Sequence, residues 1–282
     1  MNFPLQLAAE VERNVVAALA EDIGGGDLTA QLTPAGQVAR GTVVSRENAV
    51  LCGIAWFDAC FLRLDPDAKI GWAAQDGDPL CEGQVLCEIL AETRTLLTAE
   101  RSALNFLQLL SATATATRRY VDAIAGTSAM IVDTRKTLPG LRLAQKYAVS
   151  CGGGVNHRLG LYDGILIKEN HIIAAGGITA ALAQARALGR NDVFIQIEIE
   201  NLAQLTEALD VGVEMILLDN MNLAQMRDAV KINDGRALLE ASGGVRLETV
   251  RAIAETGVDR ISVGSLTKDV KAIDLSLRHV ER

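Results

Sequence analysis

Ionisable side chains close a series of short apolar runs in the second half of the sequence. The run ILIK ends on Lys168, where an ammonium needs an anion, a substrate or a carbonyl partner, unless it only extends into solvent. Glu198 and Asp219 end two further runs; they could hold ribose hydroxyls or Mg²⁺, because hard carboxylate oxygens suit that ion, or act as paired acid and base. The polar residues at the run ends are Asp133 with Arg135 and Lys136, Lys168, Glu198, Asp219, Glu240 with Ser242, and Gly264 with Ser265.

The segment 133–171 is cationic within an acidic chain. It holds six Lys or Arg and three Asp or Glu, a net +3, whereas all 282 residues include 27 basic and 35 acidic ones, a net −8. The remainder is therefore −11. With His157 and His171, this segment suggests a small anion carrying several carboxylates or phosphates, and Arg135 and Arg158 suit carboxylates because a guanidinium binds them bidentately. The acidic total argues against nucleic acid or an anionic membrane as the main partner.

Two glycine-containing turns follow the last two apolar runs. SGG at 242–244 and SVGS at 262–265 each precede a helical stretch, and bare backbone amides at helix starts bind phosphate in many barrels. We therefore expect a phosphate site there. CGGGVNHR at 151–158 is, on spacing alone, only a flexible loop.

The six apolar runs are expected to be parallel strands. Their starts, near residues 129, 163, 193, 214, 237 and 260, alternate with helical stretches at the pace of βα units joined by right-handed crossovers. In a parallel barrel the strand ends share one rim, so the polar residues at the run ends should converge. The alternative is that the charges lie at both ends of ordinary strands and do not converge.

The first half of the chain predicts a separate, smaller domain. Apolar residues at helical spacing from Leu5 to Leu19 indicate an amphipathic helix that stops at the glycines 24–26. Short β-like runs and one helical piece between residues 38 and 91 indicate an α+β domain. The stretch 95–125 lacks Gly and Pro and predicts a linking helix or a helix pair.

Cysteine usage and the first residues bear on localisation. The five cysteines form no CxxC pair, so buried reduced thiols are expected rather than a disulfide framework or a zinc site. The first 24 residues lack a basic segment and carry four acids, which is wrong for a secretion signal, and no apolar stretch is long enough to span a bilayer. We expect a soluble, cytoplasmic protein.

Several blocks of the sequence resemble one known enzyme family. EDIGGGDLT, TAERSALNFLQLLSATATAT, DTRKTLPGLRLAQKYAV, GGGVNHRLGLYDGILIKENH, EIEN, ILLDNM, EASGGV and DRISVGSLTK closely resemble quinolinate phosphoribosyltransferases, also called nicotinate-nucleotide pyrophosphorylases (carboxylating), over essentially the whole chain. The resemblance implies an α/β fold: an N-terminal open α/β sandwich domain, residues 1–110, and an incomplete α/β barrel of about six βα units, residues 111–269. Residues 270–282 would pack back on the sandwich domain.

The resemblance also implies an activity. The family are glycosyltransferases (pentosyltransferases) of NAD biosynthesis; they transfer phosphoribosyl from phosphoribosyl pyrophosphate to quinolinate with decarboxylation, giving nicotinate mononucleotide, pyrophosphate and CO₂. The expected enzyme is a homodimer that uses Mg²⁺ and whose active site is completed by Arg101 of the partner subunit. On spacing alone, Arg101 could instead be an ordinary surface charge on a long helix.

Site roles follow from the same resemblance, position by position. Carboxylates of quinolinate would be bound by Arg135, Lys136, His157 and Arg158, with Thr134 beside them. Lys168 would lie between the substrates. Glu198 and Asp219 would hold the ribose hydroxyls and the Mg²⁺, partly through water or substrate, and with Lys136 and Lys168 form the expected catalytic set. The 5′-phosphate would be bound by Ser242, Gly243, Gly244, Val263, Gly264 and Ser265.

The residues alone are also compatible with three other functions. A related transferase could use another acceptor, such as nicotinate, although the arginine set favours a dicarboxylate. Lys168 could be the Schiff-base lysine of a barrel aldolase, which borohydride trapping would reveal. A metabolite-binding protein could keep the pocket without turnover.

Overall fold

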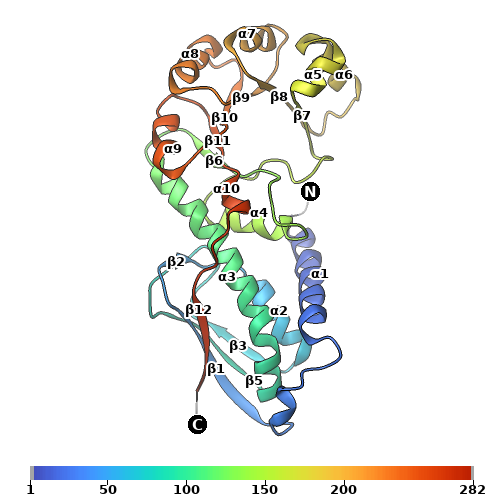
Figure 1. Cartoon of the computed structure of the whole chain (residues 1–282), viewed down its shortest axis with the longest axis vertical. Helices are drawn as coiled ribbons and strands as arrows, with labels where there is room; N and C mark the ends of the chain where they lie inside the picture. Colours follow the sequence, from blue (N-terminus) through green and yellow to red (C-terminus); the bar gives the residue numbers. More distant parts are fainter. Residues whose placement is uncertain (1–2, 281–282) are drawn as a thin grey trace. The chain divides into compact units, whose positions relative to one another are not determined.

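The structure, a computed structural model, describes residues 3–280 and divides the chain into two compact units (Figure 1). The first comprises the chain up to Arg118, Thr137–Gly153 and the chain from Thr267; the second comprises Arg119–Lys136 and Gly154–Leu266. The sequence-based boundary after residue 110 falls inside one long helix. Positions 1–2 and 281–282, which the predicted domain ranges include, lie outside the described residues.

The first unit contains a four-stranded antiparallel sheet in the order β12-β1-β5-β3. Its strands are β1 (Val38–Ser45), β3 (Lys69–Trp72), β5 (Val85–Glu92) and β12 (Leu275–Val280), and a separate pair is formed by β2 (Ala49–Val50) and β4 (Pro79–Leu80). The last strand of the chain, β12, pairs with β1 from Ser45↔Leu275 to Arg40↔Val280. The C-terminal segment thus belongs to the same sheet as the N-terminal strands.

Helices form the other layer of this unit, which confirms the expected open α/β sandwich. They are α1 (Phe3–Ile23), the 3₁₀ turn Ala30–Leu32, α2 (Ile54–Leu64), α3 (Thr93–Ala123) and α4 (Arg142–Cys151). α1 ends just before the glycines 24–26, as predicted. α3 is one continuous helix of 31 residues rather than a helix pair.

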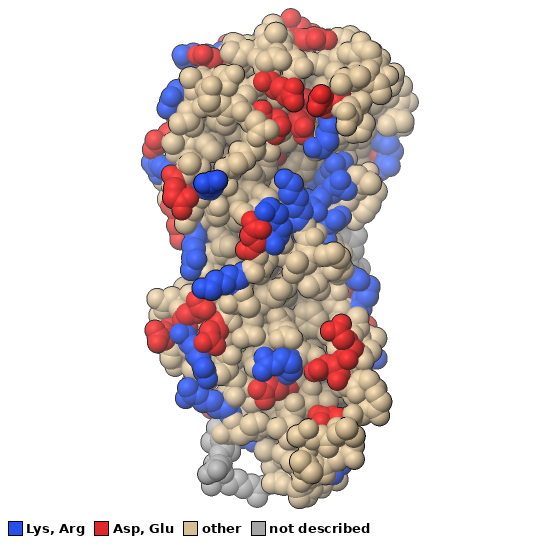
Figure 2. Space-filling view, in the orientation of Figure 1, with Lys and Arg blue, Asp and Glu red and all other residues tan. Residues whose placement is uncertain are grey.

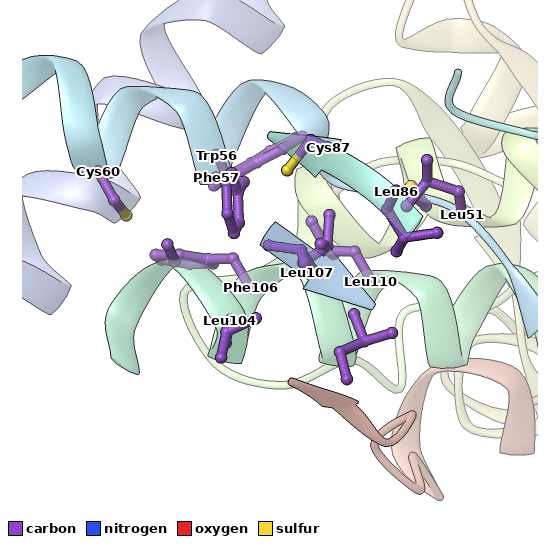
Figure 3. Close-up of a cluster of buried hydrophobic side chains, with 14 of the residues drawn as sticks. Leu51, Trp56, Phe57, Cys60, Leu86, Cys87, Leu104, Phe106, Leu107 and Leu110 are labelled. Carbon is purple, nitrogen blue, oxygen red and sulfur yellow. The ribbon is translucent and has the colours of Figure 1, made fainter. Parts of the chain in front are cut away.

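The core of the first unit lies between α2, α3 and the sheet (Figure 3). Trp56 and Phe57 of α2 and Leu107 of α3 are fully buried. Burial of each such side chain stabilises the fold by about 1.5–3 kcal/mol. Gly53, whose φ of 114° is left-handed, precedes α2, and a Cβ there would lie 3.1 Å from Leu110 Cδ1, so the approach of α2 to α3 requires glycine.

The cysteines are free thiols. Cys52, Cys60 and Cys87 are buried as expected, whereas Cys81 is exposed and Cys151 is half-buried, so uniform burial of the thiols was a wrong prediction. Cys81 lies in the turn between β4 and β5, where its backbone amide donates to Gln84 Oε1. A turn of this kind lies on the surface, outside the hydrophobic core, so its cysteine is not buried.

A six-stranded parallel sheet forms the second unit, in the order β6-β11-β10-β9-β8-β7. Its strands are β6 (Met130–Val132), β7 (Gly164–Ile167), β8 (Phe194–Ile199), β9 (Met215–Asp219), β10 (Leu238–Ser242) and β11 (Arg260–Ser262). No strand pairing joins β6 to β7 among the described residues, so the barrel is incomplete. The six predicted strands are confirmed, each starting within one residue of its predicted position.

Helices follow the strands and cover the sheet (Figure 1). They are α5 (Glu169–Ala175), α6 (Ile178–Ala187), α7 (Leu202–Asp210), α8 (Leu223–Asn233), α9 (Leu247–Ala254) and α10 (Ser265–Lys268). Asn201 and Asn222 cap α7 and α8 by accepting backbone amides, which fixes where each strand-end loop becomes a helix. Within residues 3–280, no helix is both long and apolar enough to cross a bilayer.

Candidate active site

The carboxyl ends of the parallel strands bring the predicted residues to one edge of the second unit. Ser242 is in register with Asp219, and Glu198 lies one strand further along, opposite Leu217. Lys168 directly follows β7, which pairs with β8. The expectation that these strand-end residues converge is thus met by the sheet register.

A mixed-charge cluster lies at this edge. Lys168 Nζ is 2.9 Å from Glu198 Oε2, with the two side chains 49% and 17% exposed. Burial, and next the Glu198 carboxylate, raise the pKa of Asp219 above its ordinary value, while Lys168 and Lys136 oppose that rise. Two carboxylates and two ammonium groups are therefore close enough to act on one another. A half-exposed ion pair adds little to stability, so its side chains remain available to a ligand.

Lys136 joins this cluster to one of the glycine turns. A Cβ on Gly264 would lie 3.1 Å from Lys136 Cδ and 3.7 Å from Thr134 Oγ1. Thr134 Oγ1 also accepts the Lys136 amide at 3.1 Å. Glycine at position 264 lets the backbone of the turn approach the lysine closely. Val263 is buried and its amide donates to Val132 O at 2.9 Å, so that amide belongs to the sheet, and Ser265 Oγ lies 3.5 Å from Tyr120 Oη.

The other glycine turn is shaped by a residue that the sequence analysis did not single out, Asn220. Its φ is 54°, in the left-handed region, and its amide donates to Ser242 O at 3.0 Å. Gly243 has a φ of 100°, and a Cβ there would overlap the Asn220 side chain. Asn220 Nδ2 donates to Asp219 Oδ2 at 2.7 Å. An asparagine directly after a strand-end aspartate is a signal for this kind of tight turn.

Two arginines of the cationic segment, Arg135 and Arg158, are close enough for their charges to interact. Burial lowers the pKa of Arg158, and the nearby Arg135 guanidinium lowers it further. Arg158 is 9% exposed, and its Nη1 donates to Gly164 O at 3.0 Å. An anion bound beside Arg158 would offset the unfavourable effect of the Arg135 charge. Basic side chains also gather in one patch on the face shown in Figure 2.

The segment 151–158 is more ordered than its glycines suggest. Val155 forms a parallel bridge with Val132, donating to Ile131 O and accepting from the Asp133 amide. The buried Asp133 carboxylate accepts the His157 amide at 2.8 Å. The prediction of a flexible loop is therefore wrong for its second half, because the backbone pairs with the open edge of β6.

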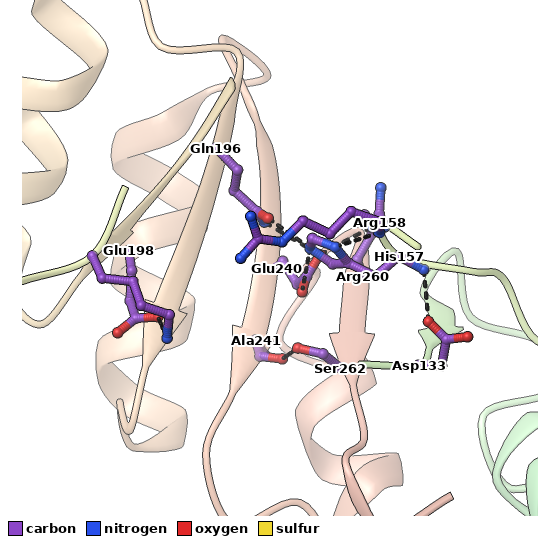
Figure 4. Close-up of polar contacts among 10 residues, drawn as sticks. Asp133, His157, Arg158, Gln196, Glu198, Glu240, Ala241, Arg260 and Ser262 are labelled. Carbon is purple, nitrogen blue, oxygen red and sulfur yellow. Dashed lines mark hydrogen bonds and ion pairs between the residues drawn. The ribbon is translucent and has the colours of Figure 1, made fainter. Parts of the chain in front are cut away.

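The His157 ring faces the side chains of Gln196 and Glu240 (Figure 4). Its Nδ1 accepts the Arg158 amide at 2.7 Å, and its Nε2 lies 2.8 Å from Gln196 Oε1. Gln196 Nε2 in turn donates to Glu240 Oε2 at 3.3 Å, and both of these side chains are buried. Gln196 was not singled out from the sequence; its signal is a polar residue in the middle of the apolar strand FIQIEI.

Arg101 belongs to the first unit, unlike the other predicted site residues. It is exposed on α3 and lines a cavity of about 410 Å³ with residues of α1 and of the segment Pro139–Leu141. Asn14 and Arg13 of α1 both donate to Gly140 O beside this cavity. An exposed guanidinium in a cavity wall can receive an anion from solvent or from another molecule.

The donor set at the strand ends fits Mg²⁺. Glu198 and Asp219 offer carboxylate oxygens, and a divalent cation would offset the Glu198 charge, which after burial is the second cause of the raised pKa of Asp219. Among the described residues, no group of three His, Cys, Asp or Glu side chains suited to one metal includes either of them. Glu198 and Asp219 would therefore share the ion with oxygens of substrate or water.

Comparisons with known proteins match most of the chain. Models of the quinolinate phosphoribosyl transferase N-terminal and C-terminal domains match residues 27–111 and 113–278. The nicotinate-nucleotide pyrophosphorylase [carboxylating] of Mycobacterium leprae is 46% identical over 92% of this chain and 94% of its own length. The probable enzyme of that name from Bacillus subtilis is 42% identical over 91% and 89%. The structure of the nicotinate-nucleotide pyrophosphorylase from Francisella tularensis superposes with a TM-score of 0.94, at 44% identity and 97% coverage of both chains. The chain belongs to the quinolinate phosphoribosyl transferase family.

Proposed function

We propose that this protein transfers the phosphoribosyl group of phosphoribosyl pyrophosphate to quinolinate and releases pyrophosphate and CO₂, forming nicotinate mononucleotide for NAD biosynthesis. The observation that carries the proposal is the buried Arg158 guanidinium, which donates to Gly164 O at 3.0 Å and is close enough to Arg135 for that charge to lower the pKa of Arg158. A ligand with two adjacent carboxylates would satisfy both guanidiniums.

The binding of the acceptor rests on these two side chains. Arg135 and Arg158 would each bind a carboxylate of quinolinate, and Lys136 would add charge from the neighbouring position. Lys168, which already binds the Glu198 carboxylate, would exchange that contact for substrate oxygens lying between the two ligands. Ionic hydrogen bonds of this kind position the pyridine nitrogen for attack.

Phosphoribosyl pyrophosphate, the donor, would bind through the two glycine turns and the two strand-end carboxylates. The turns at Gly243–Gly244 and Gly264–Ser265 would bind the 5′-phosphate, since glycine leaves backbone amides accessible. Glu198 and Asp219 would accept hydrogen bonds from the ribose hydroxyls and hold Mg²⁺. When bound, Mg²⁺ supplies positive charge to the pyrophosphate as it departs.

The reaction requires few proton transfers from the protein. The pyridine nitrogen of quinolinate forms a bond to C1 of the ribose while the bond from C1 to pyrophosphate breaks. Glu198 and Asp219 stabilise the positive charge that develops on the ribose ring. The ring nitrogen is then cationic, so the bond from the neighbouring ring carbon to its carboxylate breaks and CO₂ leaves. The electron pair left on that carbon is stabilised by the cationic ring and then forms a C–H bond with a proton from solvent.

We further propose that the enzyme is a cytoplasmic homodimer in which Arg101 of one subunit serves the site of the other. The cavity beside Arg101 supports a role in binding beyond its own helix. The free thiols suit a reducing compartment.

Acceptor choice tests the proposed function. Purified protein is incubated with phosphoribosyl pyrophosphate and Mg²⁺, and with quinolinate or nicotinate as the only acceptor. We expect kcat/KM for quinolinate to exceed that for nicotinate by at least about tenfold, because nicotinate leaves one guanidinium without its carboxylate. Equal use of both acceptors, or preference for nicotinate, would overturn the proposal.

A further inference from the structure

A directed chain of hydrogen bonds runs from the Arg158 backbone to a buried carboxylate (Figure 4). The Arg158 amide donates to His157 Nδ1 at 2.7 Å, so Nδ1 carries no proton. The ring proton is therefore on Nε2, which donates to Gln196 Oε1 at 2.8 Å. Gln196 Nε2 then donates to Glu240 Oε2 at 3.3 Å. Every donor in the chain points toward Glu240.

Glu240 is an unusual residue to find here. Its side chain is 1% exposed on a central strand, and its Oε1 has no hydrogen-bond partner among the described residues, although His157 Nε2 lies 3.7 Å away. Arg260 Nε forms an ion pair with Glu240 Oε2 at 3.1 Å, with the two side chains 14% and 1% exposed, although the N–H is not aligned for a hydrogen bond. The ion pair with Arg260 compensates part of the cost of burying this carboxylate, but it does not account for Oε1 or for the contact of Oε2 with Gln196.

The reason for a carboxylate at this position is that it accepts hydrogen bonds but cannot donate one. Facing Glu240, the Gln196 amide must present its NH₂ group to the carboxylate and its oxygen to His157. A glutamine at position 240 could donate or accept, so Gln196 could turn over and present NH₂ to the imidazole instead. His157 would then favour a proton on Nδ1, where it would oppose the Arg158 amide.

We propose that Glu240, acting through Gln196, is a positioning residue that fixes His157 as its neutral Nε2–H tautomer and thereby orients Arg158 for the acceptor's carboxylate. This inference rests on the proposed function only for the identity of the acceptor. It also assigns His157 to the support of Arg158 rather than to direct binding of a carboxylate, because both of its ring nitrogens contact the chain itself.

The test combines a spectroscopic signature with kinetics. The sequence has only three histidines, so ¹⁵N-labelled imidazole signals can be assigned with His→Asn variants. In the wild-type protein His157 should show a single neutral Nε2–H tautomer. In Glu240→Gln we expect a mixture or the opposite tautomer, together with an increase of about tenfold in the KM for quinolinate and a kcat within about twofold of wild type.

Matched variants keep the outcome interpretable. Glu214→Gln makes the same change at an exposed position just before β9 and should leave both measurements unchanged. Glu240→Asp keeps a side chain that only accepts hydrogen bonds and should retain the His157 tautomer. If Glu240→Gln does not fold, the spectra of Glu240→Asp and of the wild-type protein test the proposal. A charged or Nδ1–H ring in the wild type, or a raised KM with an unchanged tautomer, would overturn the proposal. A wild-type protein that shows the tautomer but does not use quinolinate would refute the proposed function alone.

Discussion

Lys168 Nζ and Glu198 Oε2 lie 2.9 Å apart although their residues are 30 positions apart in the sequence. The pair joins the ends of the adjacent parallel strands β7 and β8. Because Lys168 is 49% exposed, the pair stabilises the fold by less than about 1 kcal/mol. We interpret it as an ion pair of the substrate-free protein. When substrate binds, each side chain would give up this contact and bind a substrate group instead.

Replacement of Lys168 should separate activity from stability. Lys168→Met should lower kcat by about 10²–10³-fold, because a fixed charge near the developing pyrophosphate is lost. Thermal unfolding should change little, since the lost ion pair is exposed. Steady-state kinetics and calorimetry on the same preparation check this. A near-normal kcat with a markedly lower Tm would show that Lys168 has a structural role instead.

Arg135→Ala should mainly weaken acceptor binding. Loss of ionic hydrogen bonds worth about 1.5–3 kcal/mol raises the KM for quinolinate by about 10–100-fold, with less effect on the KM for phosphoribosyl pyrophosphate. Arg142→Ala is the control, because it removes a charge from the same cationic segment of the sequence but on a helix of the first unit. Equal effects of the two substitutions would contradict the assigned carboxylate site.

Arg101 and Arg135 should complement one another between subunits. Arg101→Ala and Arg135→Ala homodimers should each be poorly active, whereas mixed dimers isolated with two affinity tags should recover about half the wild-type activity. One of the two sites in a mixed dimer then has both arginines intact. Recovery would be absent if Arg101 served only its own subunit, or if the protein were monomeric.

Asp58 should make the first unit more stable in mild acid than it is at neutral pH. Burial raises the pKa of Asp58 from 3.8 to about 6, even though Trp72 Nε1 donates to it at 2.9 Å. The folded state therefore favours the protonated acid, and this contribution is lost as pH rises from about 4 to about 6.

The matching substitution isolates that effect. Asp58→Asn keeps an acceptor for Trp72 and should raise the free energy of unfolding at pH 7 by about 1 kcal/mol, after allowance for solvent screening, with almost no gain at pH 4. Denaturant unfolding at both pH values measures it. The same gain at both would mean that charge is not the cause.

Thiol labelling should follow burial. Burial raises the pKa of Cys60 and Cys87 to about 12, so at pH 8 neither should react with iodoacetamide until the protein unfolds. Cys81 is exposed and should react first. Mass spectrometry of timed samples gives the order, and Cys81→Ser identifies the fast site. Early modification of Cys60 would show that the core of the first unit opens readily.

The sequence predicted the parallel sheet well because its strands are apolar runs with ordered spacing. Runs such as MILLD are buried by helices, and burial on both faces leaves little choice of structure. The polar strand ends were visible for the same reason: Lys168 and Asp219 each end an apolar run. Local pattern therefore located the rim of the site.

Contacts between distant segments could not be predicted in this way. The support of Arg158 depends on Gln196 and Glu240, which lie on different strands and meet only in the folded sheet. The order of residues 155–157 depends on hydrogen bonds to the open edge of β6, which no glycine count reveals. The involvement of Arg101 came only from family resemblance and remains a prediction.

The central claim is that transfer and decarboxylation occur together on a dicarboxylate. Quinolinate labelled with ¹³C in the carboxylate next to the ring nitrogen is incubated with the purified protein, phosphoribosyl pyrophosphate and Mg²⁺, and product and gas are quantified. We predict one labelled CO₂ and one pyrophosphate for each nicotinate mononucleotide, with no turnover after Mg²⁺ is chelated. Retention of the label in the nucleotide, or the absence of any nucleotide with Mg²⁺ present, would contradict the account.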